Sequence, residues 1–410
     1  MKRIVNILLA VLAISFCTNA QVKVGVEVLR DGGFAPLKGK RVGLITNPTG
    51  VDRNLKSTID ILHEAPEVEL TALFSPEHGV RGDVYAGAHV SNYKDPATGV
   101  PVYSIFGKTL KPTPEMLKDV DVLVYDIQDI GCRSYTFIST MGKAMEACAE
   151  LGKQFVVLDR PNPVGGNKIE GNITEPDCVS FVSQYPIPYL YGMTPGELAG
   201  YFNNEGLLAG GAKVDLTVIP MEGWTRDMPF DRTGQPWVLP SPHIPSAETA
   251  LFYPATGILG ELGVISIGVG YTLPFKLVAA PWIDAARLSS RLNDLDIPGV
   301  RFRPIHIKPF YAVNQGENIQ GVEIYVTDKE VAPLTLIQFY IMQELAAMYP
   351  DRDPLASADQ RRHVMFDKVC GSKEIRRRFV KNHRVDDMKS YWNKDVEPFH
   401  AASSKYYLYK

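Results

Sequence analysis

Short apolar runs alternate with amphipathic stretches through the first half of the chain. Five runs have the length and composition of buried strands: residues 41–46, 68–74, 120–127, 155–158 and 214–219. Apolar residues three or four apart predict helices between them, at residues 51–63 and 137–148. A third helix is predicted to begin at the capping box Thr194 to Glu197 and to run toward Phe202. Buried strands in alternation with helices predict a parallel sheet that is covered on both faces.

The second half repeats this pattern after an irregular stretch. Residues 221–254 are rich in Pro, Trp and turn residues, which predicts a long functional loop and a nearby domain boundary. Beyond it we expect strands at 276–280, 300–307 and 322–326, and helices at 284–295 and 334–348. With 410 residues, one hydrophobic core rarely suffices. The sequence therefore predicts an α/β fold of two domains, residues 21–250 and a smaller α/β domain at residues 251–410.

The first twenty residues have a different composition. Lys2 and Arg3 precede an apolar run at 4–16, and small residues follow it up to Ala20. This pattern predicts a cleaved signal peptide and an exported, periplasmic protein. A lipoprotein anchored through Cys17 is the alternative, against which the bulky Phe16 argues. No later segment is long and apolar enough to predict a membrane-spanning helix.

The charge balance excludes one class of partner. The chain has a formal charge of −3 and a pI near 6.3, and loss of Lys2 and Arg3 takes the charge to −5. Nucleic-acid binders carry a basic excess or stripe. The single basic cluster, within residues 373–381, is interpreted as a solvated helix face. We therefore expect no nucleic-acid partner.

The cysteines and histidines do not predict a metal site. Four cysteines remain after signal cleavage, at positions 132, 148, 178 and 370, and their spacing favours buried free thiols over disulfides. The sequence has no HExxH motif and no Cys/His cluster at ligand spacing. It also lacks the G-x-S-x-G and GxxxxGK[ST] motifs, and Gly263, Gly268 and Gly270 match a dinucleotide fingerprint only in part. No cofactor is expected.

Polar side chains gather at the predicted carboxyl ends of three strands, where parallel sheets bind ligands. Carboxylates, arginine, tyrosines and amides together suit a polyhydroxylated ligand. The residues are Glu77 and His78; Tyr125, Asp126, Gln128, Asp129, Arg133 and Tyr135; and Asp159, Arg160 and Asn162.

Glu77 is the leading candidate among them. It lies between Pro76 and His78-Gly79, in a loop whose backbone these neighbours define. A partly buried glutamic acid with a raised pKa can protonate a leaving oxygen. The alternative is a loop carboxylate that pairs with Arg81. His78 has a structural alternative as well, and Asp126 and Asp129 form either a carboxylate pair or helix caps.

At these loops the sequence resembles bacterial exo-β-N-acetylmuramidases, a family long catalogued as a domain of unknown function. These glycoside hydrolases release N-acetylmuramic acid from the non-reducing end of peptidoglycan fragments. The resemblance spans nearly all of the chain after residue 20. It is carried by LITNPTG (44–50), FSPEHGVRG (74–82), VYDIQDIGCRSYTF (124–137), LDRPNP (158–163), YGMTPGELA (191–199) and PFKLVAAPW (274–282).

The resemblance implies a Rossmann-like N-terminal domain, a smaller C-terminal α/β domain and an active-site cleft between them. It implies that Glu77, in S-P-E-H-G, is the catalytic candidate, and it implies no metal or nucleotide cofactor. Peptidoglycan-derived saccharides are the expected partners, and the oligomeric state is left open.

The chain departs from the family at two places. His243 replaces the asparagine of S-P-N-I-P. After Glu261, a stretch similar to S-E-G-R-G-T has become S-I-G-V-G-Y, so that Ile267 and Val269 replace an acidic and a basic residue. If that basic residue meets the lactyl carboxylate of muramic acid, its loss removes a charge-assisted contact. The substrate is then a modified muramic acid or another amino sugar, or Arg81 or Arg133 holds the carboxylate.

The resulting hypothesis is general-acid catalysis by Glu77, with a second group from Glu261, Asp126 or Asp159, or from Tyr125 or Tyr135. Two rival functions are a non-catalytic periplasmic sugar-binding protein and a metal-dependent hydrolase that uses Asp126, Asp129 and Asp159. The remaining residues are assigned to substrate binding: His78, Arg81, Tyr125, Gln128, Arg133, Tyr135, Asp159, Asn162 and His243.

Overall fold

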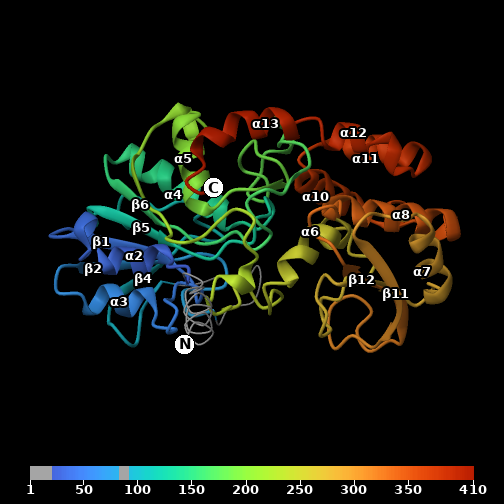
Figure 1. The fold of residues 1–410 in the computed structure, drawn as a ribbon, viewed down its shortest axis with the longest axis horizontal. Helices are drawn as coiled ribbons and strands as arrows, with labels where there is room; N and C mark the ends of the chain where they lie inside the picture. Colours follow the sequence, from blue (N-terminus) through green and yellow to red (C-terminus); the bar gives the residue numbers. More distant parts are fainter. Residues whose placement is uncertain (1–20, 83–91) are drawn as a thin grey trace, which may run out of the picture.

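A computed structural model describes residues 21–82 and 92–410. Two α/β domains lie side by side, with the larger at the left of Figure 1 and the smaller at the right. The predicted signal peptide, residues 1–20, lies outside the described residues. Within the described part, no helix combines the length and hydrophobicity needed to cross a membrane.

The larger domain is built on a seven-stranded sheet of order β3-β4-β2-β1-β5-β6-β9. All of its pairs are parallel except that of β3 with β4. The strands are β1 (Arg41–Thr46), β2 (Glu69–Ser75), β3 (Tyr93–Lys94), β4 (Pro101–Ser104), β5 (Val122–Asp126), β6 (Gln154–Leu158) and β9 (Asp215–Ile219). The five predicted strands are all present, and the α/β fold with a mainly parallel sheet is confirmed.

The order of the strands fixes where the loops meet. In β1, Ile45 pairs with Phe74 of β2 on one side and with Tyr125 of β5 on the other. The chain therefore reverses its direction of travel across the sheet at β1, which is where parallel α/β sheets form their ligand crevice. The loops that follow β2 and β5 leave the sheet at this one edge.

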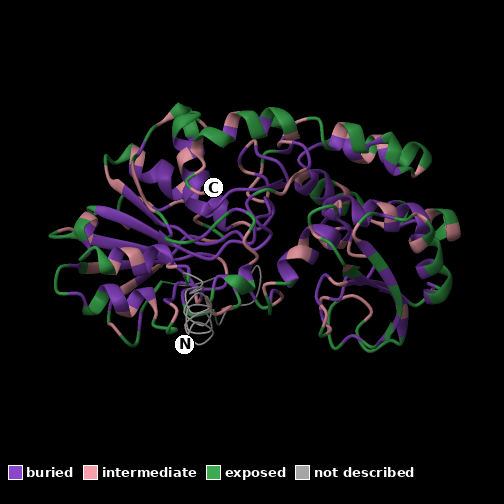
Figure 2. Cartoon of the chain, viewed as in Figure 1, coloured by how far each residue is buried: buried purple, intermediate pink, exposed green. Residues whose placement is uncertain are grey.

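Helices cover both faces of this sheet, whose strands are largely buried in Figure 2. One face packs against α2 (Gly25–Asp31) and α3 (Thr58–Glu64), and the other against α4 (Phe137–Glu150) and α5 (Pro195–Asn204). The capping box at Thr194 is present. The helix predicted at 51–63 begins only at residue 58, because the Ser57 side chain caps it and a tight turn around Asp52 precedes it.

The smaller domain has an antiparallel sheet of order β10-β12-β11. Its strands are β10 (Leu277–Ala280), β11 (Val300–Ile307) and β12 (Ile319–Val326), and its helices include α7 (Ala285–Asp294) and α8 (Ile337–Met348). The segment predicted as a loop at 221–254 ends in a helix, α6 (Thr249–Gly260). This helix was hidden in the sequence because it contains Pro254.

The C-terminal helices return the chain to the larger domain. They are α9 (Pro354–Ser357), α10 (Gln360–Cys370), α11 (Lys373–Asn382), α12 (Lys389–Trp392) and α13 (Val396–Ser403). A separate two-stranded sheet is formed by β7 (Ile169–Glu170) and β8 (Leu190–Tyr191), which come between β6 and α5 in the sequence. Figure 1 shows α13 spanning from the smaller domain toward the larger one, where the chain ends. Trp392 is fully buried against Tyr189 and Phe339, so one hydrophobic core runs through both domains.

The four described cysteines are buried free thiols, as predicted. The basic cluster lies on α11, where Arg377 and Arg378 pair with Glu374 on the exposed surface, in agreement with a solvated helix face.

Candidate active site

A cavity of about 260 Å³ lies where the two domains meet. The larger domain contributes the loops after β2 and β5, and the smaller domain contributes α6 and the loop that follows it. The cavity is lined by Glu77, His78, Ser134, Tyr135, Thr136, Phe137, Val182, Ser241, His243, Ile244, Tyr253, Glu261 and Phe275. Two carboxyl groups, two histidines and two tyrosines thus face one space.

Glu77 is held in the cavity wall by a constrained loop. It follows β2 and Pro76, and the next two residues, His78 and Gly79, both have left-handed backbones with φ of 73° and 83°. Such a conformation is uncommon for a non-glycine residue and often occurs at functional sites. The Thr136 hydroxyl donates a hydrogen bond to Oε2 of Glu77 at 3.2 Å. This contact fixes the carboxylate against the start of α4.

Glu261 comes from the other domain, at the C-terminal end of α6. Tyr253, Gly257 and Glu261 are spaced four residues apart, so they lie along one side of this helix. Burial raises the pKa of Glu261, and the Arg362 guanidinium offsets that effect only in part. Among the residues described, none donates a hydrogen bond to the Glu261 carboxyl group.

Tyr253 lies close to both acids. Its hydroxyl is 3.3 Å from Ser134 Oγ, and its ring packs edge-on against Tyr135 with centroids 5.6 Å apart. Burial raises the pKa of Tyr253, and the carboxylates of Glu261 and Glu77 act in the same direction. This phenol therefore stays protonated and can donate a hydrogen bond to a ligand between the two acids.

Two histidines complete the polar wall. Nε2 of His243 is 2.7 Å from the Tyr311 hydroxyl, a contact that links the loop before α6 to the smaller domain. Burial lowers the pKa of His243, and the proximity of His78 lowers it further. At neutral pH His243 is therefore a neutral hydrogen-bonding group.

A second cavity, also of about 260 Å³, adjoins the first and shares Tyr253, Glu261 and Phe275 with it. Its other walls are mainly apolar and include Ile267 and Val269. Two of the three positions at which the sequence departs from the family it resembles, Ile267 and Val269, thus lie beside Glu261 in the wall of a ligand-sized space.

Asp126, a candidate second catalytic group, belongs to a buried ion pair instead of the cavity wall. Its carboxylate accepts hydrogen bonds from Arg160 at 2.5 and 3.0 Å and from the Thr58 hydroxyl. A buried arginine needs such a partner, because an unpaired charge is very costly in the interior. The Asp126 carboxylate is therefore directed toward Arg160, and Asp126 is not among the residues that line the cavity.

Asp159 also lies away from the cavity. It accepts hydrogen bonds from Thr194 Oγ1 and the Gly196 amide at 2.7 Å and from the Tyr409 hydroxyl at 2.5 Å, so it ties the N-terminus of α5 to the chain's end. Burial raises the pKa of Asp159 to about 7.

Three other candidates serve the packing of the larger domain. The Tyr125 hydroxyl donates to the Phe137 carbonyl, the Gln128 amide donates to the carbonyls of Asp129 and Pro161, and the Asn162 amide donates to the Met193 carbonyl. None of the three is among the lining residues of the two cavities.

The two arginine candidates have protein partners. Arg81 makes a bidentate ion pair with the buried Asp95, at 2.9 to 3.1 Å. Arg133 is fully buried and donates to the carbonyls of Asn172, Ile187 and Val369, which joins the domains. Both guanidinium groups are therefore engaged by the fold.

Asp126, Asp129 and Asp159 do not assemble into a metal site. Within the described ranges, no group of three or more His, Cys, Asp or Glu residues is arranged to hold a metal ion. Asp129 is instead engaged by the Gly131 amide and the Tyr191 hydroxyl. The three aspartates proposed as metal ligands for a metal-dependent hydrolase therefore do not come together in the structure.

Thr136, Ser134, Tyr253 and Phe275 were not predicted from the sequence. Tyr253 lay in the segment interpreted as a loop, and the capping position of Thr136 before the predicted helix at 137 was the one available signal for that residue. Nothing in the local sequence pattern marks Phe275 as a wall of this cavity.

Comparisons with known proteins agree along most of the chain. Residues 42–248 match a family described as exo-beta-N-acetylmuramidase NamZ, N-terminal, and residues 251–409 match its C-terminal counterpart. A peptidoglycan beta-N-acetylmuramidase NamZ of Bacillus subtilis (strain 168) is 47% identical over 389 residues, covering 95% of this chain and 92% of that protein.

Two crystal structures of DUF1343 family proteins from Bacteroides fragilis NCTC 9343 are similar as well. One has a TM-score of 0.92 and 59% identity, and the other has a TM-score of 0.75 and 29% identity. Each comparison covers 95% of this chain and 99% of the other.

Proposed function

Because this chain belongs to the exo-beta-N-acetylmuramidase NamZ family, we propose that it releases N-acetylmuramic acid, or a closely related amino sugar, from the non-reducing end of peptidoglycan fragments. The chain is a glycosidase, which argues against the alternative function of a non-catalytic sugar-binding protein. The observation that supports the detailed proposal is the cavity at the domain junction, in which Glu77 and Glu261 face one space from opposite domains.

Glycoside hydrolysis uses two carboxyl groups on either side of the scissile bond. In the proposed mechanism, Glu77 protonates the glycosidic oxygen as the leaving sugar departs. Glu261 supplies the second carboxylate, either as the nucleophile or as the base that activates water. Carboxyl groups roughly 5 Å apart give retention of configuration, and groups roughly 6.5–9.5 Å apart give inversion.

One observation favours the reverse assignment of the two acids. A proton donor needs a raised pKa, and burial raises the pKa of Glu261. The Thr136 hydroxyl donates a hydrogen bond to Glu77, whereas no described residue donates one to the Glu261 carboxyl group. An exchange of roles keeps the same reaction and the same two residues, and the leaving group of the substrate distinguishes the two assignments.

Recognition of the lactyl carboxylate is proposed to fall to the histidines. Arg81 and Arg133 are held by other partners, and the second cavity presents Ile267 and Val269. His78 and His243 are the nitrogen-bearing side chains in the wall of the first cavity. A neutral His243 can donate one hydrogen bond to a carboxylate, which distinguishes muramic acid from glucosamine.

The proposal includes export to the periplasm. It is supported by the charged, apolar and small-residue segments of residues 1–20, which fit a cleaved signal peptide. Edman sequencing of the protein recovered from a periplasmic fraction is expected to begin near Gln21.

The test of function is hydrolysis of a chromogenic β-N-acetylmuramide by the wild-type protein, beside the matched β-N-acetylglucosaminide that lacks the lactyl group. We expect turnover of the muramide and at least tenfold weaker turnover of the glucosaminide. Absence of turnover with the muramide would contradict the proposed substrate, and preference for the glucosaminide would point to another amino sugar.

A further inference from the structure

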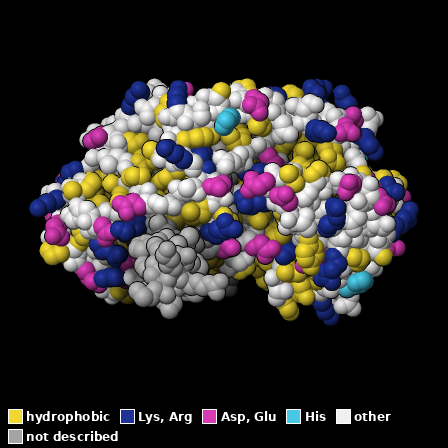
Figure 3. All heavy atoms as spheres, in the orientation of Figure 1, with side chains coloured by type: hydrophobic (Ala, Val, Ile, Leu, Met, Phe, Trp, Pro, Cys, Tyr) yellow, Lys and Arg dark blue, Asp and Glu magenta, His cyan; other side chains and the backbone are white. Residues whose placement is uncertain are grey.

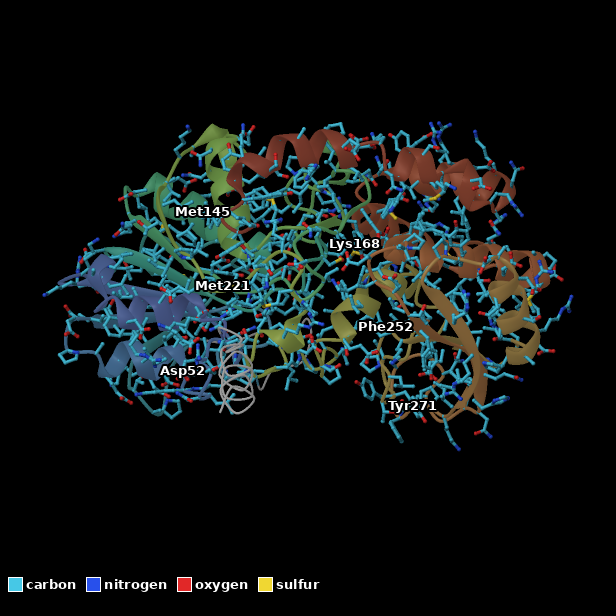
Figure 4. All side chains as sticks on the ribbon, viewed as in Figure 1. Asp52, Met145, Lys168, Met221, Phe252 and Tyr271 are labelled. Atoms are coloured by element: carbon cyan, nitrogen blue, oxygen red, sulfur yellow. The ribbon has the colours of Figure 1, made fainter. Side chains whose placement is uncertain are left out.

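A groove in the smaller domain lies outside the machinery described so far. It has a volume of about 640 Å³, against about 260 Å³ for the catalytic cavity. It runs between the β11–β12 hairpin end and the loop that contains Tyr271, and its lining includes Tyr271, His306, Lys308, Phe310, Asn318 and Gln320. Figure 4 places Tyr271 at the loop end of the smaller domain, and Figure 3 shows hydrophobic side chains on the surface there.

The floor of this groove is aromatic and exposed. The rings of Tyr271 and Phe310 are stacked, with centroids 5.8 Å apart and an angle of 21° between their planes. Phe310 is 67% exposed, and the next residue, Tyr311, which lies outside the lining of the groove, is 48% exposed. Single exposed apolar residues are common, whereas neighbouring exposed apolar side chains are typical of ligand-binding grooves.

The aromatic loop is held rigidly. The Phe310 amide donates to the Gly270 carbonyl at 2.7 Å, and the Gly316 amide donates to the Pro309 carbonyl at 2.9 Å. A Cβ atom at Gly270 would lie 2.0 Å from the Tyr311 carbonyl oxygen, so only glycine permits this approach of the two loops. The ring faces are therefore presented without a large ordering cost on binding.

The same loop leads to the catalytic cavity. The Tyr311 hydroxyl contacts His243, which lines that cavity. The following residues, Ala312 and Val313, line the second cavity beside Glu261. The groove is thus connected to the site of bond cleavage through four consecutive residues, 310–313.

The chemistry of the groove fits a sugar chain. Aromatic faces carry partial negative charge, and they attract the C–H groups on one face of a pyranose ring. Asn318 and Gln320 can hydrogen-bond hydroxyl and acetamido groups at the edge. Lys308 adds a positive charge, and none of the described residues that line the groove is acidic. A glycan whose lactyl groups are free carboxylates is complementary to this charge.

We propose that the groove binds the leaving-group side of a peptide-free glycan strand, several sugars beyond the bond that is cleaved. This proposal rests on the proposed function, because the glycan strand held in the groove is the substrate that the catalytic cavity would shorten. Longer peptide-free strands are then better substrates than short ones.

The test compares two substrates with the variants Phe310→Ala and Lys308→Gln. An aryl β-N-acetylmuramide fills only the catalytic cavity, whereas a peptide-free peptidoglycan hexasaccharide also reaches the groove. Each variant is expected to lower kcat/KM on the hexasaccharide about tenfold and to leave kcat/KM on the aryl substrate within about twofold. Tyr325→Ala is the matched control, since Tyr325 is an exposed aromatic residue of β12 outside the groove.

An equal loss on both substrates, or no loss on the hexasaccharide, would overturn the proposal. A loss confined to strands that carry stem peptides would assign the groove to the peptide and would overturn it as well. Calorimetric binding of the hexasaccharide tests the groove independently of catalysis. Weaker binding by Phe310→Ala supports the groove even if the aryl muramide is not hydrolysed, and unchanged binding contradicts it.

Discussion

The Thr136 hydroxyl donates to Oε2 of Glu77 at 3.2 Å, and this bond joins the loop after β2 to the residue that precedes α4. The bond holds the Glu77 carboxyl group in place, and a hydrogen bond of this kind contributes about 0.5–1.5 kcal/mol. Thr136→Val keeps the side-chain shape but removes the donor. We expect kcat on a muramyl disaccharide, whose leaving group needs the proton from Glu77, to fall roughly tenfold, with the free energy of unfolding changed much less. Thr136→Ser restores the donor and is expected to restore kcat; equal activity of the Val and Ser variants would contradict this role.

The buried pair of Asp126 and Arg160 predicts a loss of stability without a specific loss of catalysis. Asp126→Asn leaves the Arg160 charge uncompensated, at a cost of about 3–5 kcal/mol in the free energy of unfolding. Asp121→Asn is the matched control, because its partner Arg41 is exposed and such pairs contribute about 0–1 kcal/mol. Urea denaturation measures both. Full stability of Asp126→Asn together with loss of kcat would return Asp126 to the catalytic candidates.

The raised pKa of Asp159 predicts that the free energy of unfolding depends on pH. Its pKa is raised by burial from 3.8 to about 7 in the folded protein, so the folded state holds this proton more tightly than the unfolded chain does. The stabilising contribution is complete below about pH 4 and is lost as the pH rises through about 7. The stability of the wild type relative to Asp159→Asn is therefore expected to fall between pH 4 and 8. A difference that is constant with pH, in denaturation curves across this range, would contradict the assignment.

The position of His243 predicts that the pH dependence of KM differs between substrates with and without the lactyl group. In His243→Asn the side chain becomes the one typical of the family at this position. Because burial lowers the pKa of His243, the wild-type KM for the muramide is expected to decrease as the pH falls and the ring gains charge. The KM for the glucosaminide lacks this trend, and in His243→Asn the KM of neither substrate shows it. Parallel pH profiles for the two substrates in the wild type would rule out the contact.

The sequence predicted the main sheet well because its strands are short, continuous apolar runs buried on both faces. It also identified the loops after β2 and β5, since parallel topology brings strand ends together. It ranked Glu77 first, but it could not tell which of Glu261, Asp126 and Asp159 supplies the second group. Asp126 ends β5 and Asp159 follows β6, but Asp126 meets Arg160 and Asp159 meets Tyr409, a partner 250 residues away. Long-range contacts of this kind, and a helix that contains Pro254, leave no local pattern.

The central claim is that Glu77 and Glu261 are the catalytic pair and that Glu77 is the proton donor. Loss of a general acid matters when the leaving group is a sugar, and matters little when it is a good leaving group such as nitrophenolate. The decisive measurement is kcat for Glu77→Gln and Glu261→Gln on a muramyl disaccharide and on the nitrophenyl muramide. We predict that Glu77→Gln loses about 10²–10⁴-fold on the disaccharide but less than about tenfold on the nitrophenyl substrate, whereas Glu261→Gln loses activity on both. The reverse pattern would contradict Glu77 as the donor, and a fully active Glu77→Gln on the disaccharide would contradict the pair itself.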